Sequence, residues 1–170
     1  MKLEIGPGYS SIPSVPGQSY EFRPHYCIEP DVVFLDIELP KVACKCNWMV
    51  ADAQLLPFRG NVFDEMYSAH VIEHLEDPQQ FLREIARVLK RGGMITVVTP
   101  NFLSKSAYLD PDHKHVFNFM RLRRLFGTAG LKPVYPSPNV GSFFPKGLRY
   151  LLKAILLVIL DTLEIRGVKR

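Results

Sequence analysis

The stretch Leu3-Glu4-Ile5-Gly6-Pro7-Gly8 decides the fold, because an apolar strand runs there into an acidic residue and a Gly-x-Gly turn. Glycine lets the backbone approach a ligand that a Cβ would block, and it permits the φ values of a tight turn from a strand to a helix. In an open α/β sheet, a turn of this kind at the carboxyl end of a strand is where a nucleotide-like ligand lies. We therefore expect a ligand site at the start of this sequence.

Length and composition predict a single globular domain with one core. The chain has 170 residues, of which 47% are hydrophobic and 22% are charged, and these values are ordinary for such a domain. Its three unevenly spaced cysteines favour a reducing compartment over a disulfide framework. We expect no signal peptide, and the net charge of +4 does not by itself indicate a nucleic-acid partner. These features predict a cytoplasmic protein that binds no nucleic acid.

Apolar periodicity divides the chain into alternating strands and helices. Strands are expected over residues 2–5, 32–37, 48–51, 63–69, 94–99 and 131–135. One helix is expected to begin at the cap Asp77 and end at Gly92, and another to begin at the cap Asn118 and run through Phe126. This alternation predicts an α/β fold with a doubly wound, mostly parallel sheet and helices on both faces.

Acidic residues stand at the ends of three predicted strands: Glu4, Asp36 and Asp52. The carboxyl ends of parallel strands share one edge of a sheet, so these carboxylates can surround one ligand. A carboxylate after the second strand can accept two hydrogen bonds from a ribose diol, and Glu4 fits a positively charged amino group. Asp52 and the apolar residues after it suit a flat base with an exocyclic amine. A nucleoside that carries an amino acid matches this set better than a dinucleotide does, because a pyrophosphate prefers hydrogen-bond donors.

The order of motifs resembles the class I S-adenosylmethionine-dependent methyltransferases of the small-molecule type. The resemblance rests on Leu3–Gly8, Asp36, residues 52–58, Phe63-Asp64, residues 71–75, 87–93 and 110–113, Leu125-Phe126 and residues 129–131. It implies a Rossmann-like fold, S-adenosylmethionine as the cofactor, and transfer of a methyl group to a small-molecule or lipid-like acceptor.

The resemblance also implies which residues surround the cofactor. These are Glu4, Gly6 and Gly8 on its methionine side, Asp36 at the ribose, Ile37 beside the adenine, Asp52 and Ala53 at the adenine edge, and Ser68 near the methyl donor. A general base is needed only if the accepting atom carries a proton at working pH. Candidates for this base are His70, His113 and His115, whereas His74 lies in a helix-like run and is expected to be structural.

Several segments depart from the family's pattern and suggest a minimal version of the fold. Prolines recur within residues 9–30, so one long helix is not expected there, and the segment can be a lid over the site or a surface loop. Residues 38–46 are too few for a full crossover helix. No last antiparallel strand is evident after Pro136. The alternative function is therefore a catalytically inactive module that binds S-adenosylmethionine and acts through a protein partner.

One group of residues could in principle bind a metal ion: His25, Cys27, Cys44 and Cys46. The Cys-x-Cys spacing is a poor match to the spacing of zinc ligands. We therefore expect no metal, and we interpret the cysteines as buried, reduced thiols.

Residues 146–165 predict a strongly apolar helix. Within it, residues 148–160 are apolar on nearly every face and are interrupted by Arg149 and Lys153. Such a helix is buried in the core, packs in a homodimer or lies on a membrane surface, and this one is short for a transmembrane span. The expected organisation is a methyltransferase core over residues 1–145, followed by the helix and a basic tail over residues 146–170.

Overall fold

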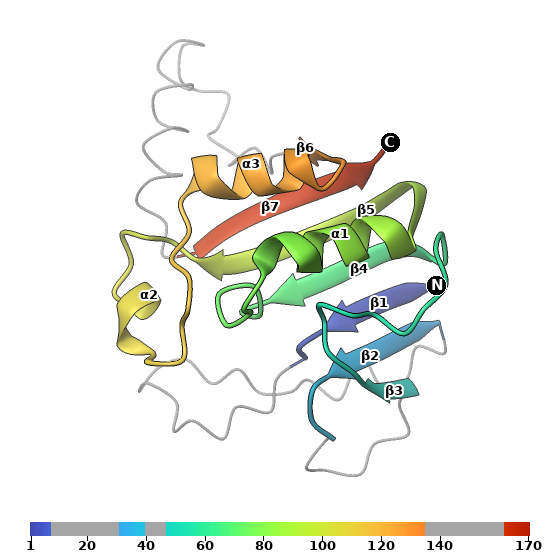
Figure 1. Cartoon of the computed structure of the whole chain (residues 1–170), viewed down its shortest axis with the longest axis horizontal. Helices are drawn as coiled ribbons and strands as arrows, with labels where there is room; N and C mark the ends of the chain where they lie inside the picture. Colours follow the sequence, from blue (N-terminus) through green and yellow to red (C-terminus); the bar gives the residue numbers. More distant parts are fainter. Residues whose placement is uncertain (8–30, 40–46, 135–161) are drawn as a thin grey trace, which may run out of the picture.

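The structure, a computed structural model, describes residues 1–7, 31–39, 47–134 and 162–170. The described strands are β1 (Lys2–Ile5), β2 (Val32–Asp36), β3 (Asn47–Val50), β4 (Phe63–Ala69), β5 (Leu89–Pro100), β6 (Leu131–Val134) and β7 (Thr162–Lys169). The described helices are α1 (Pro78–Val88), α2 (Ser106–Leu109) and α3 (Phe119–Thr128). Figure 1 shows the strands in one seven-stranded sheet with the order β3-β2-β1-β4-β5-β7-β6.

The register of the parallel strands brings their carboxyl ends together. β1 lies between β2 and β4, and Ile5 at its end is opposite Leu35 on one side and Ser68 on the other. In the next pair, Asp36 at the end of β2 is opposite Val50 at the end of β3. β4 pairs in parallel with β5. The predicted α/β fold with a mostly parallel sheet is confirmed, and the residues that follow β1 to β5 meet along one edge of it.

A hydrophobic core fills the space between one face of the sheet and the helices α1 and α3 (Figure 1). Leu3 and Ile5 are buried while Glu4 between them is only partly so, as expected of a strand that turns one face to the core. The apolar stripe of α1 is buried against this face: Phe81, Leu82, Ile85 and Val88. α3 packs beside α1, and the Thr128 hydroxyl donates a hydrogen bond of 2.6 Å to Gln79 Oε1.

Helix starts follow from the capping residues as the sequence predicts. The Asp77 carboxylate accepts hydrogen bonds from the N–H groups of Gln79 and Gln80 at 2.9 and 3.0 Å, with Pro78 in the first turn. Asn118 caps α3 in the same way by accepting from the Arg121 N–H at 2.8 Å.

Two local predictions are wrong. α1 ends at Val88 rather than at Gly92, because Leu89 already has an extended backbone and begins β5. The helix-like residues 71–75 do not form a helix, and a hydrogen bond of 3.0 Å from the His74 N–H to the Val71 carbonyl closes a turn there. Both errors arise where an apolar pattern is shared by helices and by segments that tertiary contacts hold in another conformation.

The last antiparallel strand, which the sequence did not reveal, is β7. It lies between β5 and β6 and runs antiparallel to both, so the helix predicted over residues 146–165 is wrong for residues 162–165. Leu163, Ile165 and Gly167 are buried while the residues between them are only partly buried, which is the period of a strand. The apolar run before residue 162 hid this short alternation. Arg166 and Lys169 of the predicted basic tail thus belong to the sheet.

Other predictions concern residues outside the described ranges: Gly8, the segment 9–30, most of 38–46, the cysteine and histidine constellation, and the homodimer or membrane contact of residues 148–160. None of the helices in the described part of the chain is long and apolar enough to cross a membrane.

Candidate functional site

The turn after β1 packs directly on the turn after β4. Gly6 has a φ of +67°, and its N–H donates a hydrogen bond of 2.8 Å to the Leu35 carbonyl. A Cβ on Gly6 would lie 2.2 Å from Cγ2 of Val71, so no other residue fits without a shift of one of the two turns. The requirement for glycine inferred from the sequence is therefore met by both the backbone conformation and the close contact.

Glu4 lies on the sheet face opposite Leu3 and Ile5, with Phe34 and Tyr67 as its neighbours in register. Its side chain is partly buried, and this burial raises the pKa of the carboxyl above its ordinary value. Among the described residues no cation pairs with Glu4. A carboxylate that is costly to ionise and lacks a counter-charge is suited to receive a cationic ligand group.

Asp36 is the last residue of β2, the strand next to β1, and so lies at the same edge of the sheet as the turn after β1. Its Oδ1 accepts a hydrogen bond of 2.7 Å from the Ile37 N–H, and within the described ranges its Oδ2 has no protein partner. A shallow pocket beside it is lined by Asp36, Glu38, Leu39 and Trp48. The Ile37 side chain is 72% exposed. One open carboxylate oxygen next to a pocket and an exposed apolar side chain can bind a ribose hydroxyl and one side of a base.

Asp52 and Ala53 follow β3 and stand beside the end of β2, because the Ala51 N–H donates to the Asp36 carbonyl at 2.9 Å. The Asp52 carboxylate accepts from the Gln54 N–H at 2.8 Å and so forms a local turn. Ala53 is buried, whereas the apolar side chain of Leu55 is 73% exposed. The predicted adenine-edge residues therefore lie next to the predicted ribose-binding carboxylate.

The loop that carries Asp52 is anchored by Glu84 and Arg87, neither of which was predicted to be a site residue. The Glu84 carboxylate accepts a hydrogen bond of 2.9 Å from the Leu56 N–H. Arg87 donates to the carbonyls of Leu56 and Phe58 at 2.8 and 2.7 Å. An acid and an arginine three residues apart on one helix were the available signal, but such pairs are usually solvated.

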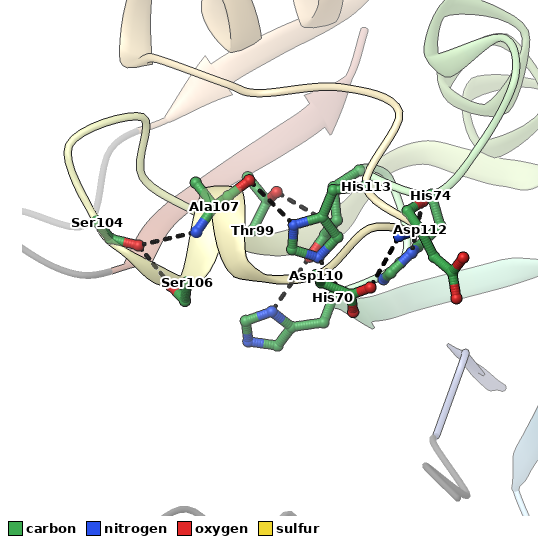
Figure 2. A network of polar contacts seen from close by, with 10 residues as sticks. His70, His74, Thr99, Ser104, Ser106, Ala107, Asp110, Asp112 and His113 are labelled. Atoms are coloured by element: carbon green, nitrogen blue, oxygen red, sulfur yellow. Dashed lines mark hydrogen bonds and ion pairs between the residues drawn. The ribbon is translucent and has the colours of Figure 1, made fainter. Parts of the chain in front are cut away.

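A second cluster lies at the carboxyl ends of β4 and β5 (Figure 2). Glu73 is 1% exposed, and its two carboxylate oxygens contact His70 Nδ1 at 3.2 Å and the Thr99 hydroxyl at 3.0 Å. His70 adopts a φ of +55°, which is uncommon outside glycine, and its N–H donates to the Val98 carbonyl. Glu73 was not predicted as a site residue, because residues 71–75 look helix-like and a glutamate on a surface helix is normally exposed.

The loop after β5 adds further histidine contacts to this region. His74 Nδ1 lies 3.3 Å from the Asp112 carbonyl, and His113 Nδ1 lies 3.2 Å from the Ala107 carbonyl. The centroids of the two rings are 4.7 Å apart in an edge-to-face arrangement. Both histidines are labelled in Figure 2. His115 instead has both ring nitrogens in contact with protein groups, the Glu76 carbonyl and the Arg121 guanidinium. Of the predicted candidates, His70 and His113 thus flank Glu73.

Ser68, the predicted residue near the methyl donor, is fully buried at the end of β4 on the same face as Ile5. In the described part of the chain, its hydroxyl is the buried side-chain group that has no hydrogen-bond partner. Such an orphaned hydroxyl is costly unless something else satisfies it.

A family model described as a methyltransferase domain matches residues 3–97 of the chain. The chain belongs to this methyltransferase domain family. The matched residues run from β1 into β5. They include Glu4, Gly6, Asp36 and Asp52 of the sheet edge, as well as Glu73 and His74.

Individual relatives of this methyltransferase domain agree with that assignment. A Mycolicibacterium smegmatis protein named as a probable S-adenosylmethionine-dependent methyltransferase is 35% identical over 100 residues, which are 56% of this chain and 38% of that protein. The 2-methyl-6-phytyl-1,4-hydroquinone methyltransferase 1 of Oryza sativa is 43% identical over 54 residues, 32% of this chain and 16% of its own. The chain thus spans less than half the length of these relatives.

The fold is shared with a solved S-adenosylmethionine-dependent methyltransferase from Archaeoglobus fulgidus. The two superpose with a TM-score of 0.66 over 99% of this chain and 85% of the other, at 16% sequence identity. At this identity the likeness concerns the fold alone. It is consistent with a mostly parallel sheet in which one strand, β7, is antiparallel to its neighbours.

S-adenosylmethionine is the cofactor of this methyltransferase family, and the residues along the sheet edge fit it. Glu4 lacks a cationic partner within the described ranges, which a ligand ammonium would supply. Asp36 offers an open carboxylate oxygen to a ribose diol. Ile37 and Leu55 leave exposed apolar surface that an adenine ring would cover. The order of these groups along the edge matches the order of groups along the cofactor.

Proposed function

We propose that this methyltransferase domain transfers a methyl group from S-adenosylmethionine to an apolar small-molecule acceptor. The observation that carries the proposal is the row of Glu4, Gly6, Asp36 and Asp52 along one edge of the sheet. When bound, the cofactor supplies an electrophilic methyl group, whose bond to sulfur breaks as the bond to the acceptor forms. The chain's own contribution is to orient the two reactants and to exclude water.

Each residue of the row has a distinct role in this proposal. Glu4 binds the ammonium of the methionine part, and Gly6 lets the backbone approach it. Asp36 accepts from the ribose hydroxyls through its open oxygen. Asp52 and Ala53 border the adenine edge, and the Asp52 carboxylate, although it caps its own turn, retains acceptor capacity for an exocyclic amine.

The acceptor side of the proposal rests on the segment that follows β5. Phe102, Leu103, Tyr108 and Leu109 are large apolar residues that are 38%, 54%, 66% and 68% exposed. Exposed apolar surface of this kind beside a site marks a place where an apolar ligand binds. His113 is tied to the same segment through the Ala107 carbonyl. An aromatic or prenylated acceptor fits such a surface, and the rice relative is named for a phytyl hydroquinone.

Calorimetry with S-adenosylhomocysteine tests the proposal on the full chain. Binding is expected, and Asp36→Ala should weaken it by about 1–3 kcal/mol through loss of hydrogen bonds to a charged group. Asp31→Ala, at an exposed position before β2, is the matched control and should bind as the unaltered chain does. An intact fold that does not bind would refute the proposal. Binding without methyl transfer to a panel of phenols, amines and prenylated quinols would favour the inactive-module alternative instead.

A further inference from the structure

We propose that Glu73, His74 and His113 bind a divalent transition-metal ion of the Zn²⁺ type. Each residue offers one ligand atom, and these three atoms lie within 4.8 Å of one another. Two imidazoles and one carboxylate form a ligand set that Zn²⁺ accepts while keeping a fourth position open. Figure 2 shows His74 and His113 of this cluster, together with Thr99 at the end of β5.

The hydrogen bonds of the two histidines prepare them as ligands. The partner of each Nδ1 is a backbone carbonyl, that of Asp112 for His74 and that of Ala107 for His113. A carbonyl oxygen only accepts, so Nδ1 is the donor in each contact, and the tautomer that makes this hydrogen bond has its lone pair on Nε2. Ligating histidines almost always donate their other N–H in this way, which sets both the tautomer and the ring orientation.

The carboxylate of Glu73 is held in a comparable way. The Thr99 hydroxyl donates to Oε2 at 3.0 Å, and His70 Nδ1 contacts Oε1 at 3.2 Å. Each carboxylate oxygen keeps a further lone pair, so both contacts are compatible with coordination of an ion. Glu73 is 1% exposed, and a buried carboxylate needs a nearby positive charge. A bound metal ion supplies that charge.

Backbone contacts bring the distant ligand to the other two. The Glu73 carbonyl accepts from the N–H groups of Lys114 and His115 at 2.9 and 3.0 Å, which pins the loop that carries His113. Asp110 Oδ2 lies 3.8 Å from His113 Nε2, too long for a hydrogen bond, and so stands beside the proposed ligand atom. Its negative charge adds to the attraction for a cation. The site is therefore assembled by the fold before any ion arrives.

Zn²⁺ calorimetry and Co²⁺ absorption on the chelator-treated full chain test the proposal without reliance on methyl transfer. One ion should bind per chain, and Co²⁺ should give visible absorption bands typical of nitrogen and oxygen ligands. His74→Asn and His113→Asn should each weaken binding by more than the roughly 10–100-fold that loss of an outer partner costs, and Thr99→Val by about that smaller factor. His115→Gln is the matched control, because both nitrogens of that ring already contact protein groups, and it should leave the affinity unchanged.

Two readouts keep the result interpretable. Affinity for S-adenosylhomocysteine should persist in the His74→Asn and His113→Asn variants, which separates loss of the metal site from loss of the fold or of the proposed function. If a variant does not fold, Zn²⁺ titration of the unaltered chain followed by NMR should shift the imidazole nitrogens of His74 and His113 and spare those of His115. Absence of binding, or binding that persists in the double variant and therefore uses other ligands such as the cysteines, would overturn the proposal.

Discussion

Glu84 and Arg87, one turn apart on α1, are paired through two nitrogen–oxygen contacts of 2.7 Å, and together they bind both backbone groups of Leu56. The helix that covers the sheet is thereby joined to the loop that carries Asp52. Because Glu84 is largely buried, its ionised carboxylate and its partners form a unit whose members are all satisfied. The position of the proposed adenine edge thus depends on a pair located on a different element.

Replacement of the carboxylate in Glu84→Gln should reduce both stability and cofactor affinity. We expect a loss of about 1–3 kcal/mol in the free energy of unfolding, because Arg87 and the Leu56 N–H lose a charged acceptor. Urea denaturation at neutral pH measures this loss, and calorimetry measures the affinity for S-adenosylhomocysteine. Arg83→Met, at an exposed position on the same helix, is the control. Equal effects of the two substitutions would show that the pair does not anchor the loop.

The same pair predicts the direction of the pH dependence of stability. The hydrogen bond from Arg87 lowers the pKa of Glu84 below its ordinary value. The stability that the pair contributes is therefore complete above the ordinary glutamate pKa and is lost as the pH falls through the lowered one. Comparison of the unaltered chain with Glu84→Gln should show a difference that is largest at neutral pH and shrinks in acid.

Cofactor binding should depend on pH through Glu4. Burial raises the pKa of this carboxyl, whereas an ammonium ligand requires its ionised form. Affinity for S-adenosylhomocysteine should be complete above the raised pKa and fall as the pH drops through it. In the ligand-free chain the sign is opposite, since stability is lost as the pH rises through that pKa. Glu4→Gln should weaken binding and flatten the pH profile, while Asp36→Asn should weaken binding and keep the profile. A profile that Glu4→Gln leaves unaltered would contradict the assignment of Glu4.

The contact between Gly6 and Val71 predicts that Gly6→Ala is severe. The new Cβ would overlap Val71, so the turn must move, and this overpacking should lower the free energy of unfolding by about 1–3 kcal/mol. The positive φ of Gly6 should cost about 1–2 kcal/mol more, because a residue with a Cβ is strained in that conformation. Gly92→Ala is a sharp control, because Gly92 also has a positive φ but its Cβ would meet nothing within 4 Å. It should carry the conformational cost alone and retain affinity for S-adenosylhomocysteine. Similar losses in both variants would mean that backbone strain, and not the contact, explains the effect.

Packing of β7 on α3 can be tested at Gly167. A Cβ there would lie 2.6 Å from Cδ1 of Phe126, so Gly167→Ala should destabilise the fold by about 1–3 kcal/mol. Gly127→Ala on α3, where a Cβ would meet nothing within 4 Å, should instead be neutral or stabilise by up to about 1 kcal/mol through helix propensity. Thermal unfolding of both variants decides the point. A harmless Gly167→Ala would place β7 elsewhere than on α3.

Elements with a strong local signal were predicted well from the sequence. The cap Asp77 with Pro78 marked the start of α1, and the residues of β1 and β4 were predicted with their observed limits. Predictions failed where the local signal was ambiguous. Residues 162–165 continued an apolar run that suits a helix, and only the pairing of β7 with β5 and β6 makes them a strand. Residues 71–75 also suit a helix until contact with Gly6 and the loop after β5 holds them in a turn.

Local pattern determined that this chain has an α/β fold with acids at the ends of its strands, because strand ends, glycine turns and helix caps are properties of short segments. The match of residues 3–97 to the family model added that the fold is a methyltransferase domain. Tertiary structure alone decided what those groups contact. Glu73 lies close to His113, which is 40 residues further along the chain, and Glu84 accepts a hydrogen bond from the loop that carries Asp52. Such encounters depend on how elements pack around a common core, and no spacing within one segment encodes them.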